Sequence, residues 1–338
     1  MTLHILRAGP AVTVQDLGRP GHAVRGLSRG GAADRLALLE GAALLGQPPD
    51  LAVLELAAMG GAFRATRTLR IALTGAPMVA QVGGRRLDWN ASHQLAAGEV
   101  LDIGAVQDGA YGYLSVGGGI AVPMVLGSRA THLVVRLGRA LRAGDSVPLG
   151  PDPAPGRPDH ALPVPDRCAG GTVRLLPTAQ TALFAPETLA RFLDTPFSRD
   201  PRGNRQGIPL VWTGAPFAAE GHLGLPSEPA QMGDIQMTGD GVPMVLGPEC
   251  QTTGGYPRLA CVHPADLPRV LQAGAALRFR MVTMAEALAP PWNESDLLAR
   301  AQASLGLRRP DGAELARRLA EGQTGGAVDA RADPFAPG

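Results

Sequence analysis

The sequence contains no lysine: all 31 of its basic residues are arginines, set against 30 acidic residues. A chain without lysine has no Walker-A phosphate loop, forms no Schiff base and carries no biotin on its own side chains. The formal net charge of +1 also argues against a large phosphate-binding surface. The complete use of arginine, with abundant alanine and glycine, is more typical of a GC-rich coding sequence than of a particular function.

Aromatic residues, cysteines and long apolar runs are scarce as well. Aromatics make up 4% of the chain, which leaves few platforms for stacking nucleobases. The three cysteines, at 168, 250 and 261, lack CxxC spacing and predict neither a disulfide framework nor a metal site. No window approaches the roughly 18 apolar residues of a membrane span, and the N-terminus does not resemble a signal peptide. We therefore expect a cytoplasmic protein.

Glycine and proline, by contrast, are abundant, with 45 and 31 residues. They punctuate short runs rich in Val, Ile and Leu, which is typical of strands in an antiparallel sandwich or barrel. The predicted strands are 3–6, 11–14, 71–73, 111–116, 122–126, 132–135, 173–176, 208–212, 235–237, 242–246 and 277–283. Helical patterns are fewer, and they predict helices over 33–46, 186–194, 267–272 (capped by Asp266), 294–306 and 311–321. The expected fold is mainly β with a few helices.

Two features predict two related domains. Seven prolines lie between residues 148 and 166, and such a segment does not pair within a sheet interior. The sequence Val-Pro-Met-Val-Leu-Gly occurs identically at 122–127 and 242–247, which we interpret as a trace of duplication. The predicted organisation is a first barrel, a linker, a second barrel, C-terminal helices and a flexible tail, over 1–147, 148–168, 169–290, 291–322 and 323–338.

Four segments combine glycine with polar side chains, as ligand-binding loops do. Residues 14–21 place Asp16 near Arg19, where the two can pair or present opposite charges to a ligand. A tight turn with a surface ion pair is the favoured explanation of that pattern. Residues 26–34 form a glycine-rich loop that runs into a helix and offers backbone N–H groups to an anion, but such loops are common.

The other two segments lie in the second half of the chain. Glu228 precedes a proline, which favours extended geometry and suits a general base or a ligand for an amide, or equally a solvated loop glutamate. Residues 251–257 (Gln-Thr-Thr-Gly-Gly-Tyr-Pro) hold an amide, two hydroxyls and a phenol around two glycines. That assortment suits a small polar substrate with carbonyl, amide or carboxylate groups, and here we favour function over a structural turn.

These segments together resemble the family of allophanate hydrolase subunit 2, also called the biotin-dependent carboxyltransferase family. It includes the C-type component of the bacterial ATP-dependent 5-oxoprolinase and the antagonist of the Kip sporulation-kinase inhibitor. The resemblance runs from about residue 3 to 285. It implies two cyclophilin-like β-barrels related by duplication. The matching pieces are 14–21, Leu54-Glu55, 72–76, 117–120, 125–129, 227–229, 233–236, 251–257 and 266–268.

The resemblance also implies a site and a reaction. Catalytic roles are expected for Glu228, Gln251, Tyr256 and Asp16, and substrate binding for Arg19, Glu55, Thr252, Thr253, Gly254, Gly255 and Arg205. The expected activity is that of a hydrolase component that opens 5-oxoproline to glutamate with hydrolysis of ATP. It would act with a subunit-1 (B-type) homologue and an A-type partner, with ATP bound by the complex and biotin, if used, on another protein.

Two other functions fit the same resemblance. One is a carboxyltransferase or allophanate-hydrolase-type component acting on urea or another small amide. The other is a non-catalytic Kip-type antagonist that binds a subunit-1-like inhibitor. Departures from the family pattern motivate the latter, because polar or aromatic groups of the family are replaced by Gly30, Ala42, Pro201 and Asn204. No nucleic-acid or membrane partner is expected.

Overall fold

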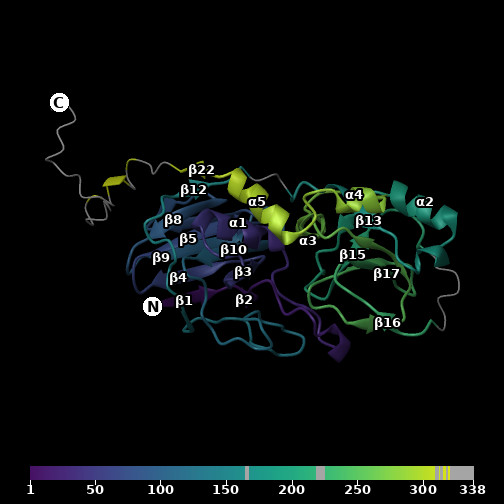
Figure 1. The fold of residues 1–338 in the computed structure, drawn as a ribbon, viewed down its shortest axis with the longest axis horizontal. Coiled ribbons are helices and arrows are strands. Elements are labelled where there is room, and N and C mark those ends of the chain that lie inside the picture. The colour runs from purple at the N-terminus through teal and green to yellow at the C-terminus, as the bar shows by residue number, and fades with distance from the viewer. Residues whose placement is uncertain (164–166, 218–224, 309–311, 313–314, 317–318, 320–338) are drawn as a thin grey trace, which may run out of the picture.

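The computed structural model describes residues 1–163, 167–217 and 225–308, with single helical residues at 312, 315, 316 and 319. Figure 1 shows two β-rich halves side by side, which we call the N-terminal half (residues 1–163) and the C-terminal half (residues 167–290). The structure is mainly β with a few helices, so the predicted fold class is confirmed. Among the described residues, no helix is long and apolar enough to cross a bilayer.

Two antiparallel sheets enclose the core of the N-terminal half. The first has the order β11 (Ser146–Pro148), β1 (Thr2–Ala8), β4 (Gly61–Ala65), β9 (Val100–Val106), β6 (Met78–Val82) and β7 (Arg85–Arg86). The second has the order β2 (Val12–Gln15), β3 (Val53–Ala57), β10 (Tyr111–Val116), β5 (Leu69–Gly75), β8 (Ala91–Leu95), β12 (His160–Ala161) and β22 (Gly306–Leu307).

The alternation of side chains along β5 explains how the second sheet is covered on both faces. Ile71 and Leu73 point into the core between the sheets, whereas Ala72 packs beneath the helix α1 (Arg35–Leu45). A Cβ atom on Gly41 of α1 would lie 2.3 Å from Oγ of Ser115 on β10. Glycine at position 41 therefore permits the close approach of α1 to the sheet, and this approach positions the loop that precedes the helix.

The C-terminal half is built on one sheet whose strands are antiparallel except for the β13–β21 pair. Its order is β14 (Ser198–Arg199), β15 (Gly207–Val211), β18 (Pro243–Leu246), β17 (Asp234–Met237), β20 (Arg258–Val262), β13 (Gly171–Leu176) and β21 (Leu277–Met281). The short strands β16 (Glu228–Pro229) and β19 (Thr253–Gly254) form a separate pair. The remaining helices are η1 (Ala23–Arg25), η2 (Thr181–Leu183), α2 (Pro186–Asp194), α3 (Leu267–Gln272), α4 (Met284–Leu288) and α5 (Glu294–Ala303).

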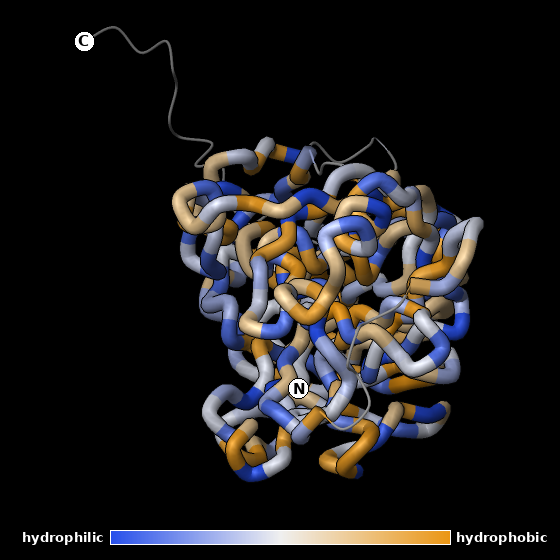
Figure 2. The backbone as a smooth tube through the Cα atoms, turned by 90° about the vertical axis from the view of Figure 1, so that its right-hand side faces the viewer, coloured by the Kyte–Doolittle hydropathy of each residue, from blue (hydrophilic) through white to orange (hydrophobic). Residues whose placement is uncertain are grey.

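The core of the C-terminal half continues into the junction with the N-terminal half. Its phenylalanine cluster packs with Val173 and Val245, and Ala33 and Tyr113 of the N-terminal half belong to the same buried cluster. Figure 2 shows hydrophobic stretches gathered in the interior of this half. Gln272 at the end of α3 bonds the backbone of Tyr111, so the two halves are docked through buried contacts.

Two of the predicted strands are wrong. Residues 122–126 and 132–135 lie in loops, in which Met124, Leu126 and Val134 are each about half exposed, whereas His132 is buried. The second copy of the repeated hexapeptide forms the strand β18, so identical sequences at 122–127 and 242–247 adopt different structures. Position in the sheet, rather than the residues themselves, decides which copy is a strand.

Segments near the predicted boundaries also differ in detail. Part of the proline-rich segment pairs with the N-terminal half, through β11 and β12, and Asp152 within it bonds Arg70 twice. Asp266 precedes α3 as expected, but its carboxylate bonds Arg174 instead of capping the helix. The predicted helix over 311–321 lies largely outside the described residues, and the predicted tail 323–338 lies wholly outside them.

Candidate functional site

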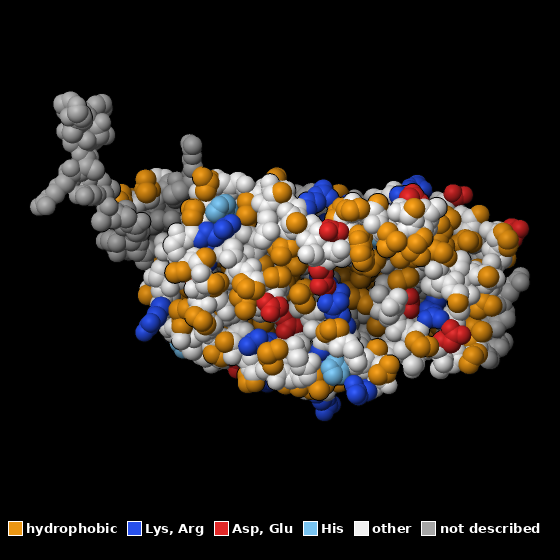
Figure 3. All heavy atoms as spheres, viewed as in Figure 1, with side chains coloured by type: hydrophobic (Ala, Val, Ile, Leu, Met, Phe, Trp, Pro, Cys, Tyr) orange, Lys and Arg blue, Asp and Glu red, His pale blue; other side chains and the backbone are white. Residues whose placement is uncertain are grey.

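A cleft lies at the junction of the halves, between residues 20–35 of one and residues 229–268 of the other. It consists of two adjoining cavities of about 410 and 770 Å³. Figure 3 shows the surface hollowed at this junction. The two cavities share six of their lining residues, which are Ala23, Leu176, Ala230, Gln231, Thr252 and Cys261. We call the smaller cavity, which reaches deepest toward α1, the inner cavity.

The inner cavity has a positive wall. Arg29 and Arg35 line it, and both pair with Glu294 on α5. The described residues that line it include no aspartate, glutamate or histidine. Ser28, Gln231 and Thr252 add two hydroxyls and an amide. This set of groups suits a small ligand with a carboxylate at one end and a carbonyl or amide at the other.

Arg35 is incompletely neutralised. Its Nη1 lies 3.5 Å from Oε1 of Glu294 on α5, and its Nε is buried without a hydrogen-bond partner in the described part of the chain. Burial and the nearby positive charge of Arg29 lower the pKa of Arg35 to about 10, although the negative charge of Glu294 opposes this shift. The guanidinium is still charged at neutral pH.

Two free thiols also line the inner cavity, those of Cys250 and Cys261. Burial, reinforced by the negative charge of Asp234, raises the pKa of both to about 12. A thiol that stays protonated at neutral pH is a poor nucleophile, so these cysteines form part of the wall rather than reactive groups.

Part of the predicted site comes together beside the cleft. Strand β16, with Glu228, pairs with β19, so Glu228 lies opposite Gly254 and Pro229 opposite Thr253. The carboxylate of Glu228 accepts hydrogen bonds from Gln180 and Arg258, at 2.8 and 2.6 Å. Thr252 lines both cavities, whereas Tyr256 is half exposed and Gln251 donates to Gln236.

Two other predicted residues, Glu55 and Arg205, belong to a buried polar cluster behind the cleft. Arg205 donates to Glu55 and Glu249, each at 2.5 Å, and to the carbonyl oxygen of Gly31. Burial alone would lower the pKa of Arg205, but the two carboxylates outweigh it and raise that pKa. Glu55 also accepts from the hydroxyl of Tyr113, which lies opposite it in the sheet. These groups join the halves and have their bonds filled by protein.

Asp16 and Arg19 do not form the predicted ion pair. The carboxylate of Asp16 instead accepts hydrogen bonds from Gly18, Ser128 and Arg129, which hold two loops together. Arg19 is 1% exposed and donates to the carbonyl oxygen of Ala130, and its Nη1 is buried with no hydrogen-bond partner among the residues that the structure describes. Desolvation lowers its pKa despite the nearby negative charges of Asp16 and Glu249.

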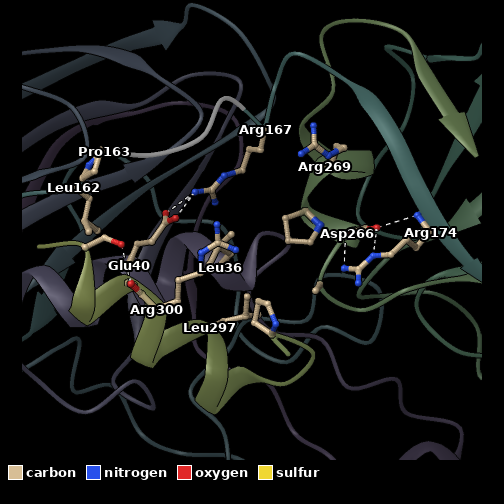
Figure 4. A pocket seen from close by; sticks show the side chains of 15 residues that line it. Leu36, Glu40, Leu162, Pro163, Arg167, Arg174, Asp266, Arg269, Leu297 and Arg300 are labelled. Carbon is tan, nitrogen blue, oxygen red and sulfur yellow. Dashed lines mark hydrogen bonds and ion pairs between the residues drawn. The ribbon is translucent and has the colours of Figure 1, made fainter. Parts of the chain in front are cut away.

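A third cavity, of about 290 Å³, lies beneath α5 and is lined by four arginines (Figure 4). Arg167 donates to both oxygens of Glu40, and Arg174 donates two hydrogen bonds to Asp266, as the dashed lines show. These internal pairs involve two of its four arginines, and Glu40 and Asp266 add negative charge to its lining.

The comparisons with known proteins agree with this architecture. The model of a family described as "Carboxyltransferase domain, subdomain A and B" matches residues 25–282. The chain belongs to this carboxyltransferase-domain family. It is 32% identical to the C-type component of Escherichia coli 5-oxoprolinase, over 85% of this chain and 93% of that protein. With the Haemophilus influenzae protein of the same name it shares 30% identity, over 84% and 93%.

Other members of the carboxyltransferase-domain family are parts of larger proteins. The urea amidolyase of Lachancea kluyveri is 27% identical over 80% of this chain but only 16% of its own length. The crystal structure of Kluyveromyces lactis urea carboxylase superimposes with a TM-score of 0.80 at 22% identity, covering 93% of this chain and 30% of that chain. This last likeness bears on the fold alone.

The departures from the family pattern fall in different places. Gly30 lies beside His132 and Arg19, so a side chain there would face the buried polar cluster. Asn204 lines a cavity of about 300 Å³ next to Arg205, Ala42 is buried in α1, and Pro201 is exposed. Within this carboxyltransferase domain only the first two positions adjoin the predicted site.

Sequence reasoning missed Arg35, Arg29, Ser28 and Gln231 as residues of the cleft. The first three lie in or next to the glycine-rich loop 26–34, whose sequence indicates an anion site through its backbone rather than through its side chains. The sequence feature that could have indicated their role is the pair of arginines, Arg29 and Arg35, at the end of that loop. Gln231 had no signal, since it enters the cleft only because the two halves dock.

Proposed function

We propose that this chain is a C-type component of an ATP-dependent 5-oxoprolinase, which acts with B-type and A-type partners in the cytoplasm. The observation that carries the proposal is the positive wall of the inner cavity, with Arg29 and Arg35 and no acidic residue among the described residues that line it. 5-Oxoproline is a small lactam with one carboxylate, so its charge is complementary to this cavity, which is large enough to hold it. The similarity to proteins named as C-type components of 5-oxoprolinase supports the same substrate.

In this proposal the guanidiniums of Arg29 and Arg35 bind the substrate carboxylate. The lactam group then lies toward Thr252 and Gln231, which offer a hydroxyl and an amide. The lactam is stabilised by resonance, and phosphorylation of its oxygen by ATP makes its carbonyl carbon open to attack by water. The chain has no lysine and no Walker-A loop, and we assign none of its residues to ATP.

The same wall distinguishes the alternatives. Urea is uncharged, so two arginines would contribute little to its binding, whereas burying an unpaired guanidinium against it would be costly. A non-catalytic antagonist needs no anion site between its halves. We therefore favour the lactam over urea and over a purely binding role.

The test is an assay of the chain co-purified with its B-type and A-type partners. The expected result is release of glutamate from 5-oxoproline that requires ATP and all three proteins, with no ATP consumption when urea replaces 5-oxoproline. A complete complex that consumes ATP with urea, or that assembles and turns over neither compound, would contradict the proposal. The second outcome would favour the antagonist.

A further inference from the structure

Ser28, His132 and Glu249 form a chain of side chains behind the inner cavity. Oγ of Ser28 lies 2.9 Å from Nε2 of His132, and Nδ1 of His132 lies 3.6 Å from Oε2 of Glu249. All three residues are buried, and Ser28 lines the cavity wall. A serine, a histidine and a carboxylate in this order are the parts of an activated nucleophile.

From this geometry we infer that Ser28 is a nucleophile that is acylated by small activated acyl compounds such as esters. This goes beyond the proposed 5-oxoprolinase role and does not depend on it, because it requires neither ATP nor a partner protein.

Each member of the triad is held in place by other bonds. Two backbone hydrogen bonds hold the loop of Ser28. The amide of Arg19 donates to the carbonyl oxygen of Arg29, and the amide of Gly30 donates to the carbonyl oxygen of Pro248. His132 exchanges two backbone hydrogen bonds with Leu137. Such supports fix a reactive group without further ordering during the reaction.

The carboxylate of Glu249 is oriented by two hydrogen-bond donors. Arg205 donates to one oxygen of Glu249 and the amide of Val134 to the other, the oxygen that faces His132. The separation of 3.6 Å from the ring nitrogen is longer than a hydrogen bond, as is common for catalytic pairs without substrate. Because Glu249 lies in the C-terminal half, docking of the two halves completes the triad.

The proposed step conserves atoms and charge. The oxygen of Ser28 attacks the carbonyl carbon of the ester while its proton passes to Nε2 of His132. The bond to the alcohol breaks as His132 returns that proton to the leaving oxygen, which leaves an ester of Ser28. Water then attacks this ester through the same proton transfers, and it releases the carboxylic acid and the free serine.

The histidine is suited to act as a base. Burial, with the positive charges of Arg19 and Arg205, lowers the pKa of His132, and the carboxylate of Glu249 opposes this shift only in part. The imidazole is therefore neutral at pH 7 and able to accept the proton of Ser28. The cysteines in the same cavity stay protonated, so serine is the nucleophile that the cleft activates.

The test is labelling of the purified full chain with a fluorophosphonate probe, followed by mass spectrometry. We expect modification of Ser28, no modification of this residue in Ser28→Ala, and labelling at least tenfold slower in His132→Gln. Ser146→Ala is the matched control, because Ser146 also bonds a histidine (His4, at 2.6 Å) but is exposed. The control should label Ser28 as the wild type does.

A pH profile of the wild type keeps the test independent of whether the variants fold. Assistance by His132 predicts a labelling rate that is constant above pH 7 and falls as the pH drops through the lowered pKa of this histidine. A rate that rises continuously to pH 9, or folded protein whose Ser28 is not labelled, would overturn the inference.

Discussion

Arg205 in the C-terminal half and Glu55 in the N-terminal half form a buried ion pair, with 2.5 Å between Nη1 and Oε1. The two residues are 150 positions apart and lie in different halves, so they come into contact when the halves dock. The pair therefore couples the folding of the two halves to the formation of the cleft between them.

Substitution Arg205→Met should be strongly destabilising. It leaves the carboxylates of Glu55 and Glu249 buried without a counter-charge, and loss of one partner of a buried pair costs about 3–5 kcal/mol. Urea denaturation should show this loss in the free energy of unfolding. Arg202→Met is the control, since Arg202 pairs with Asp200 but is 85% exposed; a similar loss in both variants would count against the structural role.

The pair of Asp266 and Arg174 predicts a pH dependence. Burial opposes ionisation of Asp266, but hydrogen bonds from the side chain and backbone of Arg174 outweigh it and lower the pKa of the carboxyl group. A carboxyl whose folded pKa is lowered stabilises the fold above its unfolded value, about 3.9, and loses that contribution as the pH falls through the folded value.

Accordingly, Asp266→Asn should reduce the free energy of unfolding at pH 7 and make little difference near pH 2. Exposed Asp50→Asn should change stability little at either pH. Unfolding curves at the two pH values give the comparison, and a cost of Asp266→Asn that is larger at pH 2 than at pH 7 would reverse the expected sign.

Glu294 competes with an anionic substrate for the arginines of the cleft. It lies 3.0 Å from Arg29 and 3.5 Å from Arg35, and its side chain is 37% exposed. Because a partly exposed pair contributes about 0–1 kcal/mol, Glu294→Gln should lower the KM for 5-oxoproline by up to about fivefold. Glu187→Gln on α2 serves as the control. A raised KM in Glu294→Gln would instead assign Glu294 the task of orienting the arginines.

More of the fold than of the candidate site could be predicted from the sequence. Runs such as 71–73 and 111–116 are apolar and bounded by turn residues, and both lie in buried strands. The runs 122–126 and 132–135 are also rich in apolar residues, but in the described structure they form isolated bridges rather than strands, and a local pattern cannot reveal that. Missed strands such as β9 alternate apolar with polar or small residues, which is a weaker signal than a continuous apolar run.

The candidate site depends on contacts across the junction. Glu228 and the 251–257 segment were both predicted as parts of the site, and the structure pairs them. Glu55 and Arg205 were predicted to bind substrate, but they form an ion pair with each other. Ser28 and Glu249 are separated by more than 200 residues, and His132 lies in an apolar run that is typical of core. Only the docked halves bring such residues together.

Arg35 is the residue on which the proposed substrate depends most directly. The deciding measurement is the KM for 5-oxoproline of the assembled complex that contains Arg35→Gln, compared with wild type and with Arg25→Gln, an exposed arginine of η1. Loss of a charge-assisted bond worth about 1.5–3 kcal/mol should raise the KM by about tenfold or more in Arg35→Gln and leave Arg25→Gln unchanged. An unaltered KM in Arg35→Gln would contradict the assignment of the inner cavity as the carboxylate site.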